Sequence, residues 1–207
     1  LDETDYSLSD AYFALYNQYV ACGGEVAYGK IGTYSVKTAT AYNAAYNAAA
    51  ELLGEKKATD GEYDDARTAL ANAYDALEYY GGLCKIRSAY MDTNGNSTYS
   101  TGKLVYVNAE NKPFFEEAED ENPSKYVWEF VPVEGGYNLK SLHTQSYVTA
   151  ASNAAQVVLS DEGEPKLLTI HFFTDDIVRL DVDGGNPLHA QDNGSKLVGW
   201  NGGLNSA

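Results

Sequence analysis

The chain has 207 residues, and its hydrophobic content of 44% is ordinary for a globular protein with one or two buried cores. Its formal net charge of −16 disfavours nucleic acid and anionic membranes as partners, because both are bound through clustered lysine and arginine. No apolar run approaches the length that spans a bilayer, so we expect no membrane insertion.

Residues 1–82 carry three stretches in which apolar residues and alanines recur at spacings of three and four. This is the period of a helix with one buried face. Gly23 and Gly54 are the expected ends of the first two helices, and Ser35 is the expected N-cap of the second. Because the connecting loops are short, the three helices predict a small antiparallel bundle. The expected helices cover residues 9–22, 36–53 and 60–80.

The third stretch has the clearest helix signals. Thr59 and Glu62 fit a capping box, in which a hydroxyl and a carboxylate satisfy free backbone N–H groups reciprocally. Gly81 and Gly82 are the expected stop. The buried stripe of this helix resembles the helical modules called "found in various architectures", which occur in secreted and surface proteins of bacteria. The residues that carry this resemblance are Tyr63, Ala66, Leu70, Ala73 and Leu77.

From about residue 83 the pattern changes to short alternating runs, which are typical of β-strands. The clearest run, residues 125–141, predicts two strands, the first ended by Pro132 and joined to the second by a turn at residues 134–136. A weak repeat of about 40 residues, present three times, predicts a closed or capped all-β body. Opening strands are expected at 84–88, 137–141 and 178–182, third strands at 113–115, 156–159 and 196–200, and closing strands at 126–130 and 168–173.

This all-β part resembles the ricin-type β-trefoil lectin domain, through residues 126–130, 137–141 and 194–205. The last run is similar to the family pattern Gly-x-x-Val-x-x-Trp followed by Asn-Gln-x-Trp, in which the Trp and the late Asn contact sugar. Tyr126 replaces the Gln of the Gln-x-Trp signature, and the third repeat stops at Ala207 before any closing strand. The resemblance implies an α+β chain of two domains, with a three-helix bundle over 1–82 and a β-trefoil with an incomplete third repeat over 83–207.

The implied sugar site lies in the third repeat. Trp200 would offer an aromatic plate to the apolar face of a sugar ring, while amides and carboxylates would bind its hydroxyls. Asn205 matches the late Asn of the family. The acid that the family keeps on the second strand of the repeat aligns with Gln191 or Asp192. In an alternative alignment of the repeat, it aligns with Asp181. The alternative is that Trp200 belongs to the core and its polar neighbours form turns. The candidate sugar-binding residues are His189, Gln191, Asp192, Trp200, Asn201 and Asn205.

Other sites have weaker signals. The second repeat has Leu159 at the position that Trp200 occupies in the third repeat. We therefore expect the second repeat to have a structural role and to bind no sugar. Residues 92–96 and 181–184 offer alternating oxygens, yet they lack the spacing of a calcium loop, and turns account for them. We find no zinc, nucleophile-elbow or phosphate-loop spacing, so we expect no cofactor, no metal and no catalysis. The polar candidates of the second repeat are His143, Gln145, Asn153 and Gln156.

Cys22 and Cys84 are the only cysteines, and we expect two free thiols rather than a disulfide. The chain begins at Leu1 without an initiator methionine. We therefore expect a processed protein, secreted or at the cell surface, from which a targeting segment has been removed.

The sequence thus predicts a non-catalytic carbohydrate-binding or accessory module of a secreted or cell-surface bacterial protein, with a glycan as its partner. It sets no expectation for the sugar or for the oligomeric state. The alternative is a structural spacer or protein-interaction module whose degenerate trefoil binds no sugar. That alternative expects a buried Trp200 and a large exposed apolar patch elsewhere, whereas an enzyme domain would need a deep pocket with converging acids.

Overall fold

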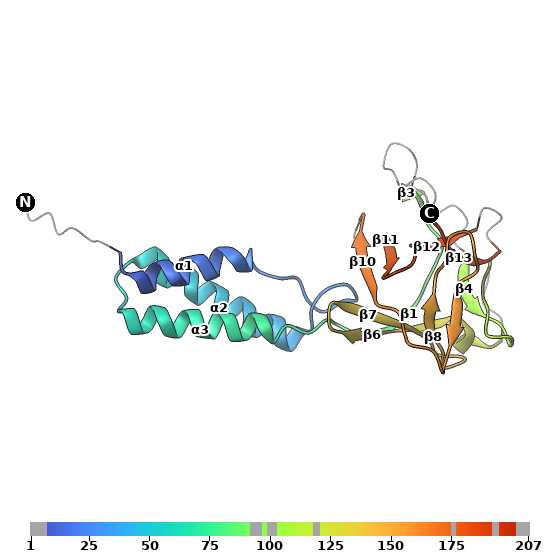
Figure 1. Ribbon diagram of the computed structural model, residues 1–207, viewed down its shortest axis with the longest axis horizontal. Helices are drawn as coiled ribbons and strands as arrows, with labels where there is room; N and C mark the ends of the chain where they lie inside the picture. The colour runs from blue at the N-terminus through green and yellow to red at the C-terminus, as the bar shows by residue number, and fades with distance from the viewer. Residues whose placement is uncertain are drawn as a thin grey trace, which may run out of the picture. The chain divides into compact units, whose positions relative to one another are not determined.

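The computed structural model shows an α+β protein, in which three α-helices precede a set of antiparallel β-strands (Figure 1). The structure describes residues 8–91, 97–98, 103–117, 121–174, 177–191 and 195–201. Contacts divide the chain into two compact units, Leu1–Tyr80 and Gly81–Ala207.

The first unit is built from three helices that lie side by side, with α2 running opposite to α1 and α3 (Figure 1). Each begins at a hydroxyl residue whose side chain accepts a hydrogen bond from a backbone N–H three residues on. At α3 the bond is reciprocal, because the Glu62 carboxylate accepts from the Thr59 backbone N–H at 2.7 Å. The helices are α1 (Asp10–Cys22), α2 (Val36–Glu55) and α3 (Asp60–Asp75).

Tyrosine and leucine side chains fill the core of this unit, as their spacing predicts. Tyr42 is fully buried, and its hydroxyl donates to the backbone oxygens of Cys22 at 3.2 Å and Gly24 at 2.8 Å. A tyrosine can therefore stand in the core without leaving its polar atom unsatisfied. The buried residues of this cluster are Tyr12, Leu15, Tyr42, Ala49, Leu53, Tyr63 and Leu70.

The third helix is shorter than the sequence predicts, ending at Asp75 instead of reaching Tyr80. The residues beyond it pair with the loop before α2. Backbone bonds join Ser35 N–H to Glu78 oxygen at 2.7 Å and Tyr80 N–H to Thr33 oxygen at 2.9 Å. These long-range bonds replace the helical bonds that the local pattern favours, so tertiary context decides where the helix ends.

The expected stop at Gly54 is also wrong. Gly54 lies inside α2, and Lys56 takes the left-handed conformation that ends the helix, with φ of 54°. Leu53 is buried in the core, so packing holds this turn of the helix in place through the glycine.

The second unit is made of short strands and one 3₁₀-helix, η1 (Pro123–Tyr126). The strands are β1 (Gly82–Lys85), β2 (Tyr90–Met91), β3 (Ser97–Thr98), β4 (Leu104–Val107), β5 (Pro113–Glu116), β6 (Val127–Val133), β7 (Gly136–Ser141), β8 (Tyr147–Ala150), β9 (Val158–Ser160), β10 (Leu168–Phe172), β11 (Val178–Val182), β12 (Leu188–Ala190) and β13 (Leu197–Gly199).

The pairing of these strands recurs along the chain, and we call each recurrence a strand set. In the first set β1 pairs with β6, and the hairpin β4–β5 lies between them in sequence. In the second, β7 pairs with β10 around the hairpin β8–β9. The third set contains β11 and the hairpin β12–β13. Successive sets are joined by β6–β7 and by β10–β11, and no other described strand pairs with β11.

Aromatic residues on the buried face of β6 form the centre of the second unit. Trp128 is fully buried and its indole N–H donates to the Val105 oxygen at 3.3 Å. Phe130 meets Tyr137 edge-to-face at 5.4 Å between ring centroids. The alternation of buried and less buried residues along β6 follows the predicted period of two.

Several strand limits differ from those expected. Pro132 does not end β6 but pairs with Tyr137 inside the ladder, and Tyr126 belongs to η1 rather than to the strand. Residues 90–91 and 97–98, where no strand is expected, form the strand pair β2–β3. Strand pairs this short carry little periodicity, so alternation cannot detect them.

Candidate functional site

The exposed indole of Trp200 is the centre of the candidate site. Trp200 follows β13, and 39% of its surface is accessible to solvent. Its ring stacks on the imidazole of His189 from β12, with 6.2 Å between centroids and 29° between the planes. The structure therefore brings two of the candidate residues together and leaves an aromatic surface open to solvent.

Strand register explains this contact. In the β12–β13 hairpin His189 is paired with Val198, so His189 and Trp200 are diagonal neighbours on one face. The Trp200 backbone N–H donates to the Pro187 oxygen at 3.0 Å, which fixes the chain just beyond β13. An aromatic group held in this way loses little freedom when it binds a ligand.

The hairpin places Gln191 away from the indole. Its backbone N–H donates to the Lys196 oxygen at 3.0 Å, at the end of the hairpin opposite to Trp200. Lys196 and Trp200 are four residues apart along an extended chain, which corresponds to about 13 Å. Asp192 and Asn205 lie outside the described residues.

Asn201 is exposed and lies directly after Trp200. Its backbone N–H donates to the side-chain oxygen of Asn153 at 3.1 Å. Asn153 comes from the loop after β8, so the second strand set supports the backbone of the candidate site. Gly199 makes this possible, because a Cβ there would stand only 2.5 Å from the Ala151 oxygen.

The remaining polar candidates of the second repeat hold loops in place. Gln145 donates to the Leu142 oxygen and Gln156 to the Pro113 oxygen, each at 2.8 Å. His143 approaches the Ser124 hydroxyl at 3.4 Å. Leu159, at the position of Trp200 in the third repeat, is buried.

Asp181, the alternative acid, is engaged by its own strand. Arg179 donates to its two carboxylate oxygens at 2.7 and 2.9 Å. Among the residues that the structure describes, no three His, Cys, Asp or Glu side chains form a group that could hold a metal ion. Residues 92–96, the other calcium-loop candidate, lie outside that part of the chain.

Both cysteines are free thiols, as the sequence predicts. Burial raises the pKa of Cys84 to about 11, so its thiol stays protonated at neutral pH and is a poor nucleophile.

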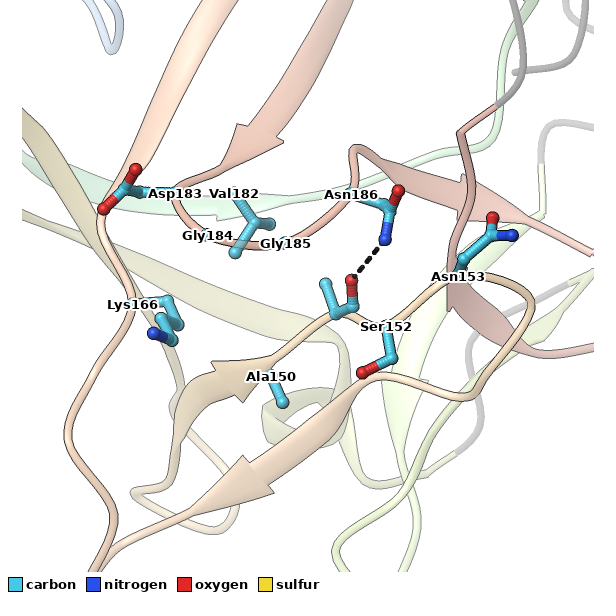
Figure 2. Close-up of a pocket in the computed structure, with 10 residues that line it drawn as sticks. Ala150, Ser152, Asn153, Lys166, Val182, Asp183, Gly184, Gly185 and Asn186 are labelled. Carbon is cyan, nitrogen blue, oxygen red and sulfur yellow. Dashed lines mark hydrogen bonds between the residues drawn. The ribbon is translucent and has the colours of Figure 1, made fainter.

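A separate pocket of about 320 Å³ lies between the loop after β8 and the turn from β11 to β12 (Figure 2). Figure 2 shows Lys166 and Asp183 on one side and Ser152, Asn153 and Asn186 on the other. Asn186 is fixed by two hydrogen bonds to the Ala151 oxygen, at 2.9 Å from its backbone N–H and 3.1 Å from its side-chain amide.

Sequence reasoning missed this pocket because its lining comes from three separate segments. Residues 150–153, Lys166 and residues 182–186 meet only through strand pairing. The one signal in the sequence is the segment 181–184, which is expected to form a turn. It is a turn, with φ of 64° at Gly184, and it also forms one wall of the pocket.

No family model, curated protein or solved structure matches the chain. None of the helices in the described part of the chain combines the length and the hydrophobicity needed to cross a membrane.

Proposed function

We propose that the second unit has a β-trefoil fold. The support is the recurrence of strand pairing, since β1–β6 and β7–β10 each enclose one hairpin and β11 precedes another. A three-fold body of this kind presents one hairpin per repeat at its surface.

We further propose that this body is a non-catalytic carbohydrate-binding module of a secreted or cell-surface bacterial protein. The observation that carries the proposal is the indole of Trp200, 39% exposed and stacked on His189. Exposed aromatic rings bind the C–H face of sugars, and the stacking on His189 pre-orients the ring for this contact. The spacer alternative expects this indole to be buried.

A glycan array that spans plant, mucin and bacterial glycans tests the proposal. Any hit is then titrated by isothermal titration calorimetry with the parent protein and two variants, because these variants lack the indole that tryptophan fluorescence would report on. Trp200→Ala should weaken binding by more than about tenfold, because it removes the central aromatic anchor. Trp200→Phe keeps a ring and should retain part of the affinity. An array without hits, or equal affinity of Trp200→Ala and the parent, would contradict the proposal.

One observation favours the alternative of a protein-interaction surface. Phe172 on β10 and Val178 on β11 face each other across the ladder, and both are more than one third exposed. Replacing both with serine should abolish any protein–protein association that uses this edge and leave glycan binding unchanged. Loss of glycan binding in this double variant would place the sugar at the sheet edge instead of at Trp200.

A further inference from the structure

The pocket beside the β11–β12 turn has the dimensions of a small ligand site. Its volume of about 320 Å³ lies at the lower end of the range for ligand pockets, roughly 300–1,000 Å³. Its apolar lining residues are Ala150 and the buried Ala151 and Val182, and the other side chains around it are polar. This is the composition of a site that orients one small polar molecule.

Two charged groups line the pocket, the Lys166 amine and the Asp183 carboxylate. Within the described residues, neither the Lys166 amine nor the Asp183 carboxylate makes a hydrogen bond or an ion pair, with each other or with any other group. Lys166 extends across the turn, since its amine lies 3.8 Å from the position that a Cβ of Gly184 would occupy. The missing side chain of Gly184 keeps the space in front of the amine open.

The opposite side supplies neutral polar groups. The Ser152 hydroxyl makes no hydrogen bond within the described residues, and it can both donate and accept. The Asn186 amide nitrogen is engaged by the Ala151 oxygen, which leaves the amide oxygen as an acceptor. The Asn153 oxygen is engaged by Asn201, which leaves its amide nitrogen as a donor.

We propose that this pocket binds a single neutral, hydroxyl-rich ring, a monosaccharide unit, at a site separate from Trp200. A sugar hydroxyl accepts from the Lys166 amine and donates to the Asp183 carboxylate, so adjacent hydroxyls satisfy both charges. A simple anion would face Asp183 and a simple cation would face Lys166, while an apolar ring would leave both charges unpaired. Ala151 and Val182 contact the C–H groups of the ring.

This site does not depend on the glycan-binding function proposed for Trp200. None of the pocket-lining residues is among the six candidate residues of that site. The Asn201 backbone N–H, which donates to the Asn153 side chain, links the two sites.

Amide-proton NMR titration of the whole chain tests the pocket and reports on both sites at once. The probes are D-glucose, D-galactose and N-acetyl-D-glucosamine, with cyclohexanol as a ring of similar size that bears one hydroxyl. At least one sugar should shift the amide signals of Ser152, Gly185 and Asn186 in a saturable way, and cyclohexanol should not. The indole N–H signal of Trp200 reports separately on the other site.

Two variants identify the groups that bind. Lys166→Met and Asp183→Asn should each weaken the pocket titration by about tenfold, because each removes one charge-assisted hydrogen bond. Lys112→Met removes a lysine that pairs with Glu110 outside the pocket and should leave the titration unchanged. Circular dichroism melts establish that all three variants fold.

The proposal is overturned if no sugar shifts the pocket amides, or if Lys166→Met and Asp183→Asn titrate like the parent. Pocket shifts that persist in Trp200→Ala would support an independent site. Shifts confined to the Trp200 indole signal would leave the glycan-binding proposal standing and reject the pocket.

Discussion

The indole ring of Trp200 stacks on the imidazole ring of His189, with their centroids 6.2 Å apart. Trp200 is the residue directly after β13, and His189 is the middle residue of β12, the partner strand in the hairpin. The contact holds the exposed indole in one orientation, so the order of the Trp200 side chain should depend on the His189 ring.

His189→Ala should therefore free the indole without removing it. We expect glycan affinity to fall about threefold to tenfold, the effect of losing one aromatic contact. Acrylamide should quench the Trp200 fluorescence more strongly in this variant. His143→Ala is the matched control, because His143 approaches Ser124 rather than an indole. Unchanged quenching in His189→Ala would show that the stacking does not order Trp200.

Trp128→Phe should destabilise the second unit by about 1–3 kcal/mol. The smaller ring leaves a cavity, and the Val105 oxygen loses its 3.3 Å hydrogen bond from the indole. Urea unfolding measures the loss. Trp200→Phe, at the exposed indole, should stay within about 0.5 kcal/mol of the parent. Similar losses in both variants would mean that the two indoles do not differ in burial as the structure describes.

Gly199→Ala should lower stability by about 1–3 kcal/mol, because the new Cβ would stand 2.5 Å from the Ala151 oxygen in a tightly packed loop. Gly61→Ala is the opposite case, with no atom within 4 Å of the new Cβ and a helical backbone. It should stabilise the first unit by roughly 0.5–1 kcal/mol. Thermal denaturation of both variants checks the signs, and a neutral Gly199→Ala would show that the loop can move aside.

Thr59→Ala should cost about 1 kcal/mol of stability, since it removes the side chain that caps α3. The Thr59 backbone N–H and then its hydroxyl, by donating to the Glu62 carboxylate, hold the pKa of Glu62 below its ordinary value. Because the folded pKa is lowered, this stabilisation is present above the ordinary pKa and is lost as pH falls through the folded pKa.

Comparison of the parent with Glu62→Gln by urea unfolding at several pH values checks this dependence. The difference in stability should be constant near neutral pH and should shrink in acid, as the carboxylate of the parent becomes protonated. A difference that does not vary with pH would assign the effect of Glu62→Gln to packing rather than to charge.

Local signals predicted most of the first unit. The capping box at Thr59, the N-cap at Ser35 and the left-handed Gly23 are formed by residues a few positions apart, and all three are confirmed. The end of α3 could not be predicted in the same way. Glu78 and Tyr80 bind the backbone near Ser35 and Thr33, and no local pattern encodes bonds across such a separation.

In the candidate site, too, local sequence predicted the strand but not the long-range contacts. The pattern placed the strand before Trp200 nearly correctly, at 196–200 against Leu197–Gly199 in the structure. Only register shows that the rings of His189 and Trp200 meet and that Gln191 lies at the other end of the hairpin. The pocket could not be predicted, because Lys166 and Asp183 belong to segments that approach each other only after β8, β10 and β11 have paired.

The strand β6 is held on both edges, by four residue pairs with β1 of its own set and by six with β7 of the next. No strand set can therefore open without breaking a ladder that belongs to its neighbour. The second unit should lose its structure in one cooperative event, and a protease cut in a single loop should leave the fragments associated.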